Sequence, residues 1–363
     1  MQTKIITTIG PKSEAPEVIK KMVEAGVDMF RFNFSHTTTE QFLRVSKLIR
    51  KISKELGKDI KIIQDLQGPR IRVGKLPAEG VMLADGQEIG FTVGQNDLPN
   101  NLINIDDKKL YEDIRRGDPL FLSNGSIELV VLAVKGDVIW CRVIQGGLLT
   151  SSKGVNVPGT NLKRGGLTEK DIADVKFALK TKQVDYVALS FVQEAEDVSK
   201  LRGIIRKEAG EKNKIKIISK IERGVALKDI DRIIVESDVI MFARGDLGIE
   251  VPVENLPIIQ KNIVRHAHWH NTPVIIATQV LTSMIISQNP TRAEVSDISN
   301  AIFDRGDAVM LSDETAVGAH PIEAVKILKK VIKRTEEYLE KKNFFDPEIQ
   351  RGTVNKYSNL NVG

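Results

Sequence analysis

The chain has 363 residues, more than one ordinary hydrophobic core accommodates, and its length predicts about two domains. Its formal charge of +5 comes without a basic run of five residues and with few aromatic residues, so we expect no nucleic-acid partner. No apolar stretch approaches the roughly 20 residues that span a bilayer, and the first apolar run leaves no room for a signal peptide. These features, with the single Cys141, predict a cytoplasmic protein without a membrane partner.

Eight short apolar runs recur along the chain, and each ends in charged or hydroxyl residues. They occupy residues 4–10, 28–35, 61–66, 186–192, 216–222, 238–244, 273–279 and 307–313. A near-continuous apolar run is typical of a strand covered on both faces, as in a parallel sheet. Helical patterns lie between most neighbouring runs, at 13–25, 38–56, 194–209, 253–270 and 321–339. The alternation predicts an α/β fold, a (β/α)8 TIM barrel, whose chemistry lies at the carboxyl ends of the strands.

One interval between runs carries a β pattern of its own. Residues 75–162 alternate apolar and polar positions and are punctuated by Gly, Asn and Asp turns. We interpret them as a small inserted β-domain, with residues 1–74 and 163–342 forming a discontinuous barrel domain. An insertion after the third barrel strand overhangs the mouth, where it can act as a lid. Residues 343–363 are polar and aperiodic, which predicts a frayed tail.

Charged residues at the ends of the fifth and sixth runs suggest a cation site. Lys220 and Glu222 fall on one face of a strand because side chains alternate with a period of two, and Asp246 follows the next run. Two carboxylates from neighbouring strand ends suit a divalent cation such as Mg²⁺, and a lysine beside it would neutralise a phosphoryl group or an enolate. From these residues alone, a structural lysine–glutamate pair at the barrel rim is an equal alternative.

The second, seventh and eighth runs also end in polar side chains. The second alternates Arg31, Asn33 and Ser35 on one face, a row that is costly to bury unless it binds something. His36 follows at once. The seventh run contributes Thr278 and the eighth contributes Ser312, so the predicted barrel mouth is polar around its rim.

Long motifs in collinear order carry a family resemblance. The segments RFNFSH, DLQGPRIRVG, IISKIE, MFARGDLGIEVP and PVIIATQVLTSM, among others between residue 3 and about 335, closely resemble those of pyruvate kinases. The resemblance implies a TIM barrel with a small β-barrel inserted after strand three. It also implies phosphoryl transfer from phosphoenolpyruvate to ADP, giving pyruvate and ATP, the last step of glycolysis.

The resemblance assigns roles position by position. Lys220, Arg31, Thr278 and Ser312 would be catalytic. Arg31, Lys220, Ala243, Arg244, Gly245, Asp246 and Thr278 would bind phosphoenolpyruvate. Asn33, His36, Arg72 and Lys153 would lie near the nucleotide phosphates, and Glu222 and Asp246 would hold Mg²⁺ or Mn²⁺.

The monovalent-cation pattern of the family is altered. Asn33, Ser35 and Asp65 match a K⁺ site, but Leu66 stands where a threonine is usual. In the segment GPRIRVG, Arg70 replaces the glutamate of K⁺-dependent members, and an aliphatic Val73 replaces a threonine. We therefore predict that Arg70 supplies the positive charge and that K⁺ is not required.

Two further departures bear on activity. The acidic turn usual in the inserted domain reads Ser123-Asn124-Gly125, and Asp313 stands where a glycine is usual. Most family members also continue past residue 340 into a further domain that forms one subunit interface, whereas the family's interface between barrels could support a homodimer here. Two alternatives therefore stay open: a catalytically impaired binding protein, and a phosphoenolpyruvate or oxoacid lyase of related fold. The lyase would not need a nucleotide lid.

Overall fold

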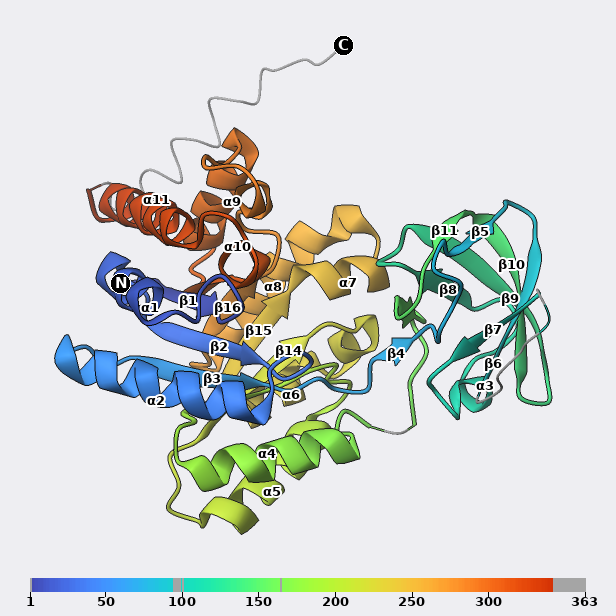
Figure 1. The fold of residues 1–363 in the computed structure, drawn as a ribbon, viewed down its shortest axis with the longest axis horizontal. Coiled ribbons are helices and arrows are strands. Elements are labelled where there is room, and N and C mark those ends of the chain that lie inside the picture. The colour runs from blue at the N-terminus through green and yellow to red at the C-terminus, as the bar shows by residue number, and fades with distance from the viewer. Residues whose placement is uncertain (1, 94–98, 100, 164, 342–363) are drawn as a thin grey trace.

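A closed barrel of eight parallel strands forms the centre of the computed structural model, which describes residues 2–93, 99, 101–163 and 165–341 (Figure 1). The strands are β1 (Lys4–Thr8), β2 (Met29–Asn33), β3 (Lys61–Asp65), β13 (Tyr186–Leu189), β14 (Lys216–Ile221), β15 (Val239–Ala243), β16 (Val274–Ala277) and β17 (Ala308–Leu311). Each lies within one of the eight predicted apolar runs. The barrel closes where β1 pairs with β17, from Lys4 opposite Ala308 to Thr7 opposite Leu311. The predicted (β/α)8 fold is confirmed.

Helices cover the outside of the barrel and connect successive strands. They are α1 (Pro16–Ala25), α2 (Thr39–Glu55), α4 (Glu169–Thr181), α5 (Ala195–Ala209), η1 (Gly224–Lys228), α6 (Ile230–Glu236), α7 (Arg244–Glu250), η2 (Val253–Asn255), α8 (Leu256–Trp269), η3 (Thr282–Ile285), α9 (Arg292–Phe303), α10 (Asp313–Ala316) and α11 (Pro321–Lys341). The side chains of Thr38, Thr168 and Thr291 cap three of them by accepting a backbone N–H of the first turn. Within the described residues, none of these helices has the length and apolar character needed to cross a membrane.

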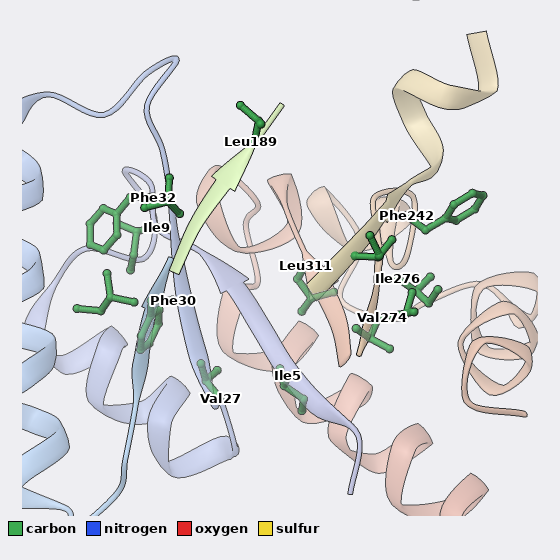
Figure 2. Packing of buried hydrophobic residues seen from close by; sticks show 14 of the residues in the cluster. Ile5, Ile9, Val27, Phe30, Phe32, Leu189, Phe242, Val274, Ile276 and Leu311 are labelled. Atoms are coloured by element: carbon green, nitrogen blue, oxygen red, sulfur yellow. The ribbon is translucent and has the colours of Figure 1, made fainter. Parts of the chain in front are cut away.

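Two separate apolar clusters explain why the barrel strands are apolar on both faces. The outward side chains pack against the helices and include Phe30, Phe32, Phe242 and Ile276 (Figure 2). Their neighbours along the strands fill the barrel interior: Ile6, Ile63, Ala188, Ile218, Met241 and Ala277 form a distinct cluster there. Each fully buried large side chain stabilises the fold by about 1.5–3 kcal/mol. The interior is therefore a packed core, and the room for chemistry lies at its mouth.

The inserted segment folds as a β-domain beside the barrel, on the side toward which α7 projects (Figure 1). Its elements are β4 (Ile71–Arg72), β5 (Val81–Leu83), β6 (Glu88–Val93), β7 (Leu102–Ile105), α3 (Leu110–Asp113), β8 (Pro119–Leu122), β9 (Ile127–Lys135), β10 (Val138–Gln145), β11 (Gly147–Leu149) and β12 (Gly154–Asn156). Seven of the strands form one sheet in the order β4-β12-β8-β9-β10-β6-β7. Val73, just after β4, bridges Ile105 in β7, so the two edges of this sheet meet.

The chain crosses between the two domains twice, and both crossings are pinned to the barrel mouth. On the way out, Gly68 donates its N–H to Asp171 in α4 at 3.1 Å. Gly68 has a φ of +69°, and a Cβ there would lie 2.9 Å from atoms of Phe191 and Ser190, so glycine is needed at this step. On the return, the side-chain amide of Gln193 makes two 2.9 Å hydrogen bonds with the backbone of Leu162.

Candidate active site

Lys220 stands at the carboxyl end of β14, inside the barrel mouth, and its amine has three polar neighbours. Nζ lies 2.7 Å from Oγ of Ser190, 2.9 Å from a carboxylate oxygen of Glu222 and 3.1 Å from Oδ1 of Asp65. Burial alone would lower the pKa of Lys220, but the carboxylates of Asp65 and Glu222 raise it above its ordinary value. The site therefore holds a permanent ammonium.

Asp65, the last residue of β3, connects Lys220 to Arg31 of β2. Its Oδ2 lies 2.5 Å from Nε of Arg31, while Nη1 of Arg31 donates to Oγ1 of Thr8 at 3.0 Å. Burial would raise the pKa of Asp65, but the positive charges of Arg31 and Lys220 lower it below its ordinary value. One buried carboxylate thus holds two cations at the mouth.

Glu222, just past the end of β14, is the second buried carboxylate. It accepts the backbone N–H of Phe191 at 2.8 Å and faces Lys220. Burial raises its pKa; Lys220 opposes that rise, whereas the nearby carboxylates of Asp246 and Asp65 add to it. A cation placed between Glu222 and Asp246 would relieve this repulsion.

The two acids fit a divalent ion whose remaining ligands come from a substrate. Within the described residues, no group of three or more His, Cys, Asp or Glu side chains could hold a metal. Mg²⁺ commonly takes only one or two carboxylates and completes its shell with water and substrate oxygens. Asp246 is part-exposed and pairs loosely with Arg70 at 3.4 Å, so its carboxylate is accessible to an ion. Two carboxylates leave most ligand positions of Mg²⁺ or Mn²⁺ open, whereas a closed structural site would fill them with protein side chains.

A second network orders the end of β16 and the start of α7. Thr278 has a φ of +67°, an unfavourable conformation for a β-branched residue, and its Oγ1 accepts the N–H of Gly245 at 2.8 Å. Arg244 donates to the carbonyl of Thr278 at 2.8 Å and pairs with Asp297 at 2.6 Å. Buried Ala243 closes β15 directly before them. These contacts fix Asp246 at the mouth, in the first turn of α7.

The residues expected at the nucleotide come from both domains. Asn33 caps the next turn, accepting the N–H of Ser35 at 3.1 Å, and His36 is exposed beyond it. Arg72 in β4 donates to the carbonyl of Ser152, and the neighbouring Lys153 is exposed on the inserted domain. Asn33 and His36 thus belong to the barrel, whereas Arg72 and Lys153 belong to the inserted domain.

The departures from the family pattern occupy different positions. Leu66 is buried, and Arg70 reaches toward Asp246. Asn124 is exposed in the β8–β9 turn with a φ of +58°, a conformation that asparagine tolerates well. Asp313 is exposed at the start of α10, while the N–H of Ser312 is held by Glu314 at 2.7 Å.

Two hydroxyl residues in the central network were missed from the sequence. The hydroxyl of Ser190 donates a hydrogen bond to the carbonyl of Leu66 at 2.7 Å and accepts one from the Lys220 ammonium. The hydroxyl of Thr8 accepts a hydrogen bond from Arg31. Ser190 and Thr8 do lie near the ends of their apolar runs, which was the available signal. Hydroxyl residues are too common at strand ends for that signal to single them out.

Comparisons with known proteins agree with this geometry. The family model for the barrel domain of pyruvate kinase matches residues 1–325. A pyruvate kinase of Agrobacterium vitis is 43% identical over 343 residues, which cover 93% of this chain and 69% of that protein. One from Thermotoga maritima is 43% identical over 339 residues, or 93% and 72% of the two chains. The crystal structure of a pyruvate kinase from Cryptosporidium parvum matches with a TM-score of 0.88 and 37% identity, covering 93% of this chain and 69% of that one.

Proposed function

The chain belongs to the pyruvate kinase family, and from this premise we propose that it is a phosphotransferase that moves the phosphoryl group of phosphoenolpyruvate to ADP. The products are pyruvate and ATP. The observation that carries the proposal is the Lys220 ammonium, held by Asp65, Ser190 and Glu222 at the mouth of the barrel. Phosphoryl transfer needs mainly positioning and positive charge, and this cluster offers both.

We assign the barrel residues to the reacting groups as follows. The guanidinium of Arg31 binds the phosphoryl oxygens, and the Lys220 ammonium stabilises both those oxygens and the enolate oxygen that forms as the P–O bond breaks. Backbone at Ala243, Arg244 and Gly245 receives the substrate carboxylate. Thr278 borders the methylene carbon that gains a proton. The hydroxyl of Ser312 helps to order a water molecule beside that carbon.

The divalent ion would be held by Glu222 and Asp246. When bound, Mg²⁺ or Mn²⁺ adds positive charge beside the transferring group. The raised pKa of Glu222 supports this assignment, because it reflects burial and the repulsion of neighbouring carboxylates. Arg70, paired with Asp246, supplies in our proposal the positive charge that K⁺ supplies elsewhere, so the K⁺ pattern of Asn33, Ser35 and Asp65 stays without a cation.

The inserted domain, predicted at residues 75–162 and including β4 (Ile71–Arg72) in the structure, is proposed to close over ADP. Lys153 and Arg72 would reach its phosphates from the inserted side, and Asn33 and His36 from the barrel side. Substrate-induced closure of this kind excludes water from the transferring group. We further propose that two barrels can associate as a homodimer.

A coupled assay with phosphoenolpyruvate, ADP and Mg²⁺ tests the function. We expect turnover by the unaltered chain, a loss of about 10³-fold in Lys220→Ala, and little change in Lys216→Ala, an exposed lysine on the same strand. Binding of phosphoenolpyruvate without turnover would instead support the impaired binding protein. Consumption of phosphoenolpyruvate independent of ADP would support the lyase.

A further inference from the structure

Arg223 bridges the barrel and the return crossing of the inserted domain. It follows Glu222 directly, and its Nη2 donates to the backbone carbonyls of Thr160 at 2.6 Å and Val157 at 3.2 Å. Both carbonyls belong to the segment that leads from β12 back to the barrel. One barrel side chain therefore binds two backbone carbonyls of the return crossing.

The same guanidinium binds α7 from the other side. Its Nε lies 3.1 Å from Oε2 of Glu250, the last residue of α7, and that oxygen also lies 3.3 Å from the N–H of Gly224. Helix α7 is a single short element that begins at Arg244 and carries Asp246. A displacement of Glu250 is therefore transmitted along less than two turns to Asp246.

The pair is buried where the two crossings meet. The side chains of Arg223 and Glu250 are 5% and 1% exposed. They line a cavity of ≈ 20 Å³, room for about one water, together with residues of the outgoing crossing and of β12, among them Arg70 and Asn156. Oε1 of Glu250 has no hydrogen-bond partner among the residues that the structure describes.

A buried ion pair of this kind is poorly explained by stability. Removing two charges from water costs about as much as their attraction returns, so an apolar pair of similar volume would serve as well. The ionic pair does make directed hydrogen bonds with three backbone groups in two segments: the carbonyls of Val157 and Thr160, and the N–H of Gly224. The geometry of the ion pair indicates that it aligns the return crossing with α7.

We propose that Arg223 is a positioning residue that couples the lid to α7: it joins the return crossing, through Val157 and Thr160, to Glu250, so that lid and Asp246 move together. This inference rests on the proposed function, in which the lid carries Lys153 to ADP and Asp246 holds the divalent ion. Arg223 itself does not touch the reacting groups in this scheme. Its effect on turnover is indirect, through the coupling of nucleotide capture to the metal acids.

Amide hydrogen exchange tests the coupling independently of turnover. The variants are Glu250→Gln and Arg223→Lys, with Arg223→Met as the stronger change and Arg232→Met as the control, since Arg232 is an exposed arginine that pairs with Glu196 on the helical surface. We expect Glu250→Gln to speed amide exchange by about tenfold in α7. We expect a similar increase in residues 157–163, which Glu250 does not contact directly, because Arg223 connects the two. Exchange that rises in α7 while residues 157–163 stay within about twofold of the unaltered chain would overturn the proposal.

The KM values for the two substrates distinguish a positioning role of Arg223 from general destabilisation of the fold. Arg223→Lys, which keeps the charge but loses the fork of donors, is expected to raise the KM for ADP about tenfold while the KM for phosphoenolpyruvate changes less than about threefold. Equal changes in both constants, or no change in either, would contradict the coupling. If the unaltered chain shows no turnover, the proposed function fails, and the exchange experiment still decides the coupling. If Arg223→Met does not fold, the two conservative variants are sufficient.

Discussion

The ammonium of Lys220 lies 3.1 Å from Oδ1 of Asp65, a carboxylate with no solvent exposure whose other oxygen binds Arg31. Three strands thus contribute to one alternating row of charges: Arg31 from β2, Asp65 from β3 and Lys220 from β14. The attraction of the central anion for both cations offsets their mutual repulsion at the mouth.

Asp65→Asn removes the shared anion. Two buried cations then face each other, so we expect the free energy of unfolding to fall by about 3–5 kcal/mol and turnover to fall by at least about 100-fold. Urea unfolding and the coupled assay measure the two effects. Asp59→Asn is the control, because Asp59 is 79% exposed and should change stability by less than about 0.5 kcal/mol. Wild-type stability in Asp65→Asn would refute the role of this anion.

Ser190→Ala removes the neutral partner of Lys220. We expect about a tenfold loss of turnover, because the ammonium can then shift toward Glu222, and a stability loss of about 1 kcal/mol. Ser199→Ala, at an exposed serine on α5, should leave both unchanged. Steady-state kinetics with phosphoenolpyruvate varied at saturating ADP distinguish the two variants. Unchanged turnover in Ser190→Ala would exclude a part for this hydroxyl in placing Lys220.

The monovalent-cation requirement depends on Arg70 in our scheme. The unaltered chain should turn over at similar rates with Na⁺, with K⁺ or with neither, because the guanidinium already stands beside Asp246 at 3.4 Å. Arg70→Met should lose about tenfold in rate and regain part of it with K⁺. Arg142→Met, at an arginine that pairs with Glu88 in the inserted domain, serves as the control. A large stimulation of the unaltered chain by K⁺ would contradict the prediction.

Glu222→Gln should separate stability from activity. Burial and repulsion from Asp246 and Asp65 raise the pKa of Glu222 against the opposing effect of Lys220, so ionisation of Glu222 is less favourable in the folded protein than in the unfolded chain. The neutral amide can still accept the N–H of Phe191. Without a divalent ion, we expect the free energy of unfolding of the variant to be about 0.5–2 kcal/mol higher than that of the unaltered chain. With Mg²⁺, we expect the variant to lose turnover. Thermal unfolding with and without EDTA provides the measurement; a less stable variant under EDTA would refute this reading.

Acid titration should expose the lowered pKa of Asp65. A carboxylate whose folded pKa lies below its unfolded value stabilises the fold at pH above the unfolded value and loses that contribution as pH falls through the folded one. The difference in unfolding free energy between the unaltered chain and Asp65→Asn should be constant above about pH 5 and shrink below about pH 4. A difference that grows toward acid pH would have the wrong sign.

The architecture was predictable because the barrel imposes a local pattern. A strand such as β14 must be apolar on both faces, as Ile217 and Ile218 show by packing into the outer and inner clusters. The two-residue period also placed Lys220 and Glu222 on one face, and their charged groups lie 2.9 Å apart. The predicted helix start at Ser13 was early: Ser13 accepts the N–H of Gly10 in a turn, and α1 begins at Pro16.

Contacts between strands were not predictable to the same degree. Leu189 pairs with Ser219 across β13 and β14, and this register brings Ser190 beside Lys220. No local pattern encodes such a register, because it depends on how the whole barrel closes. The pair of Arg223 and Glu250 likewise joins a strand end to a helix end, and neither residue belongs to a spacing that marks it in the sequence.

Closure of the barrel between β1 and β17 has a consequence for the nascent chain. Lys4 finds its partner Ala308 roughly 300 residues later, so at about 5–20 residues per second the ribosome needs tens of seconds to supply it. During that interval one edge of the first strand remains an open template for other chains. Productive synthesis therefore depends on shielding this edge until the eighth strand emerges.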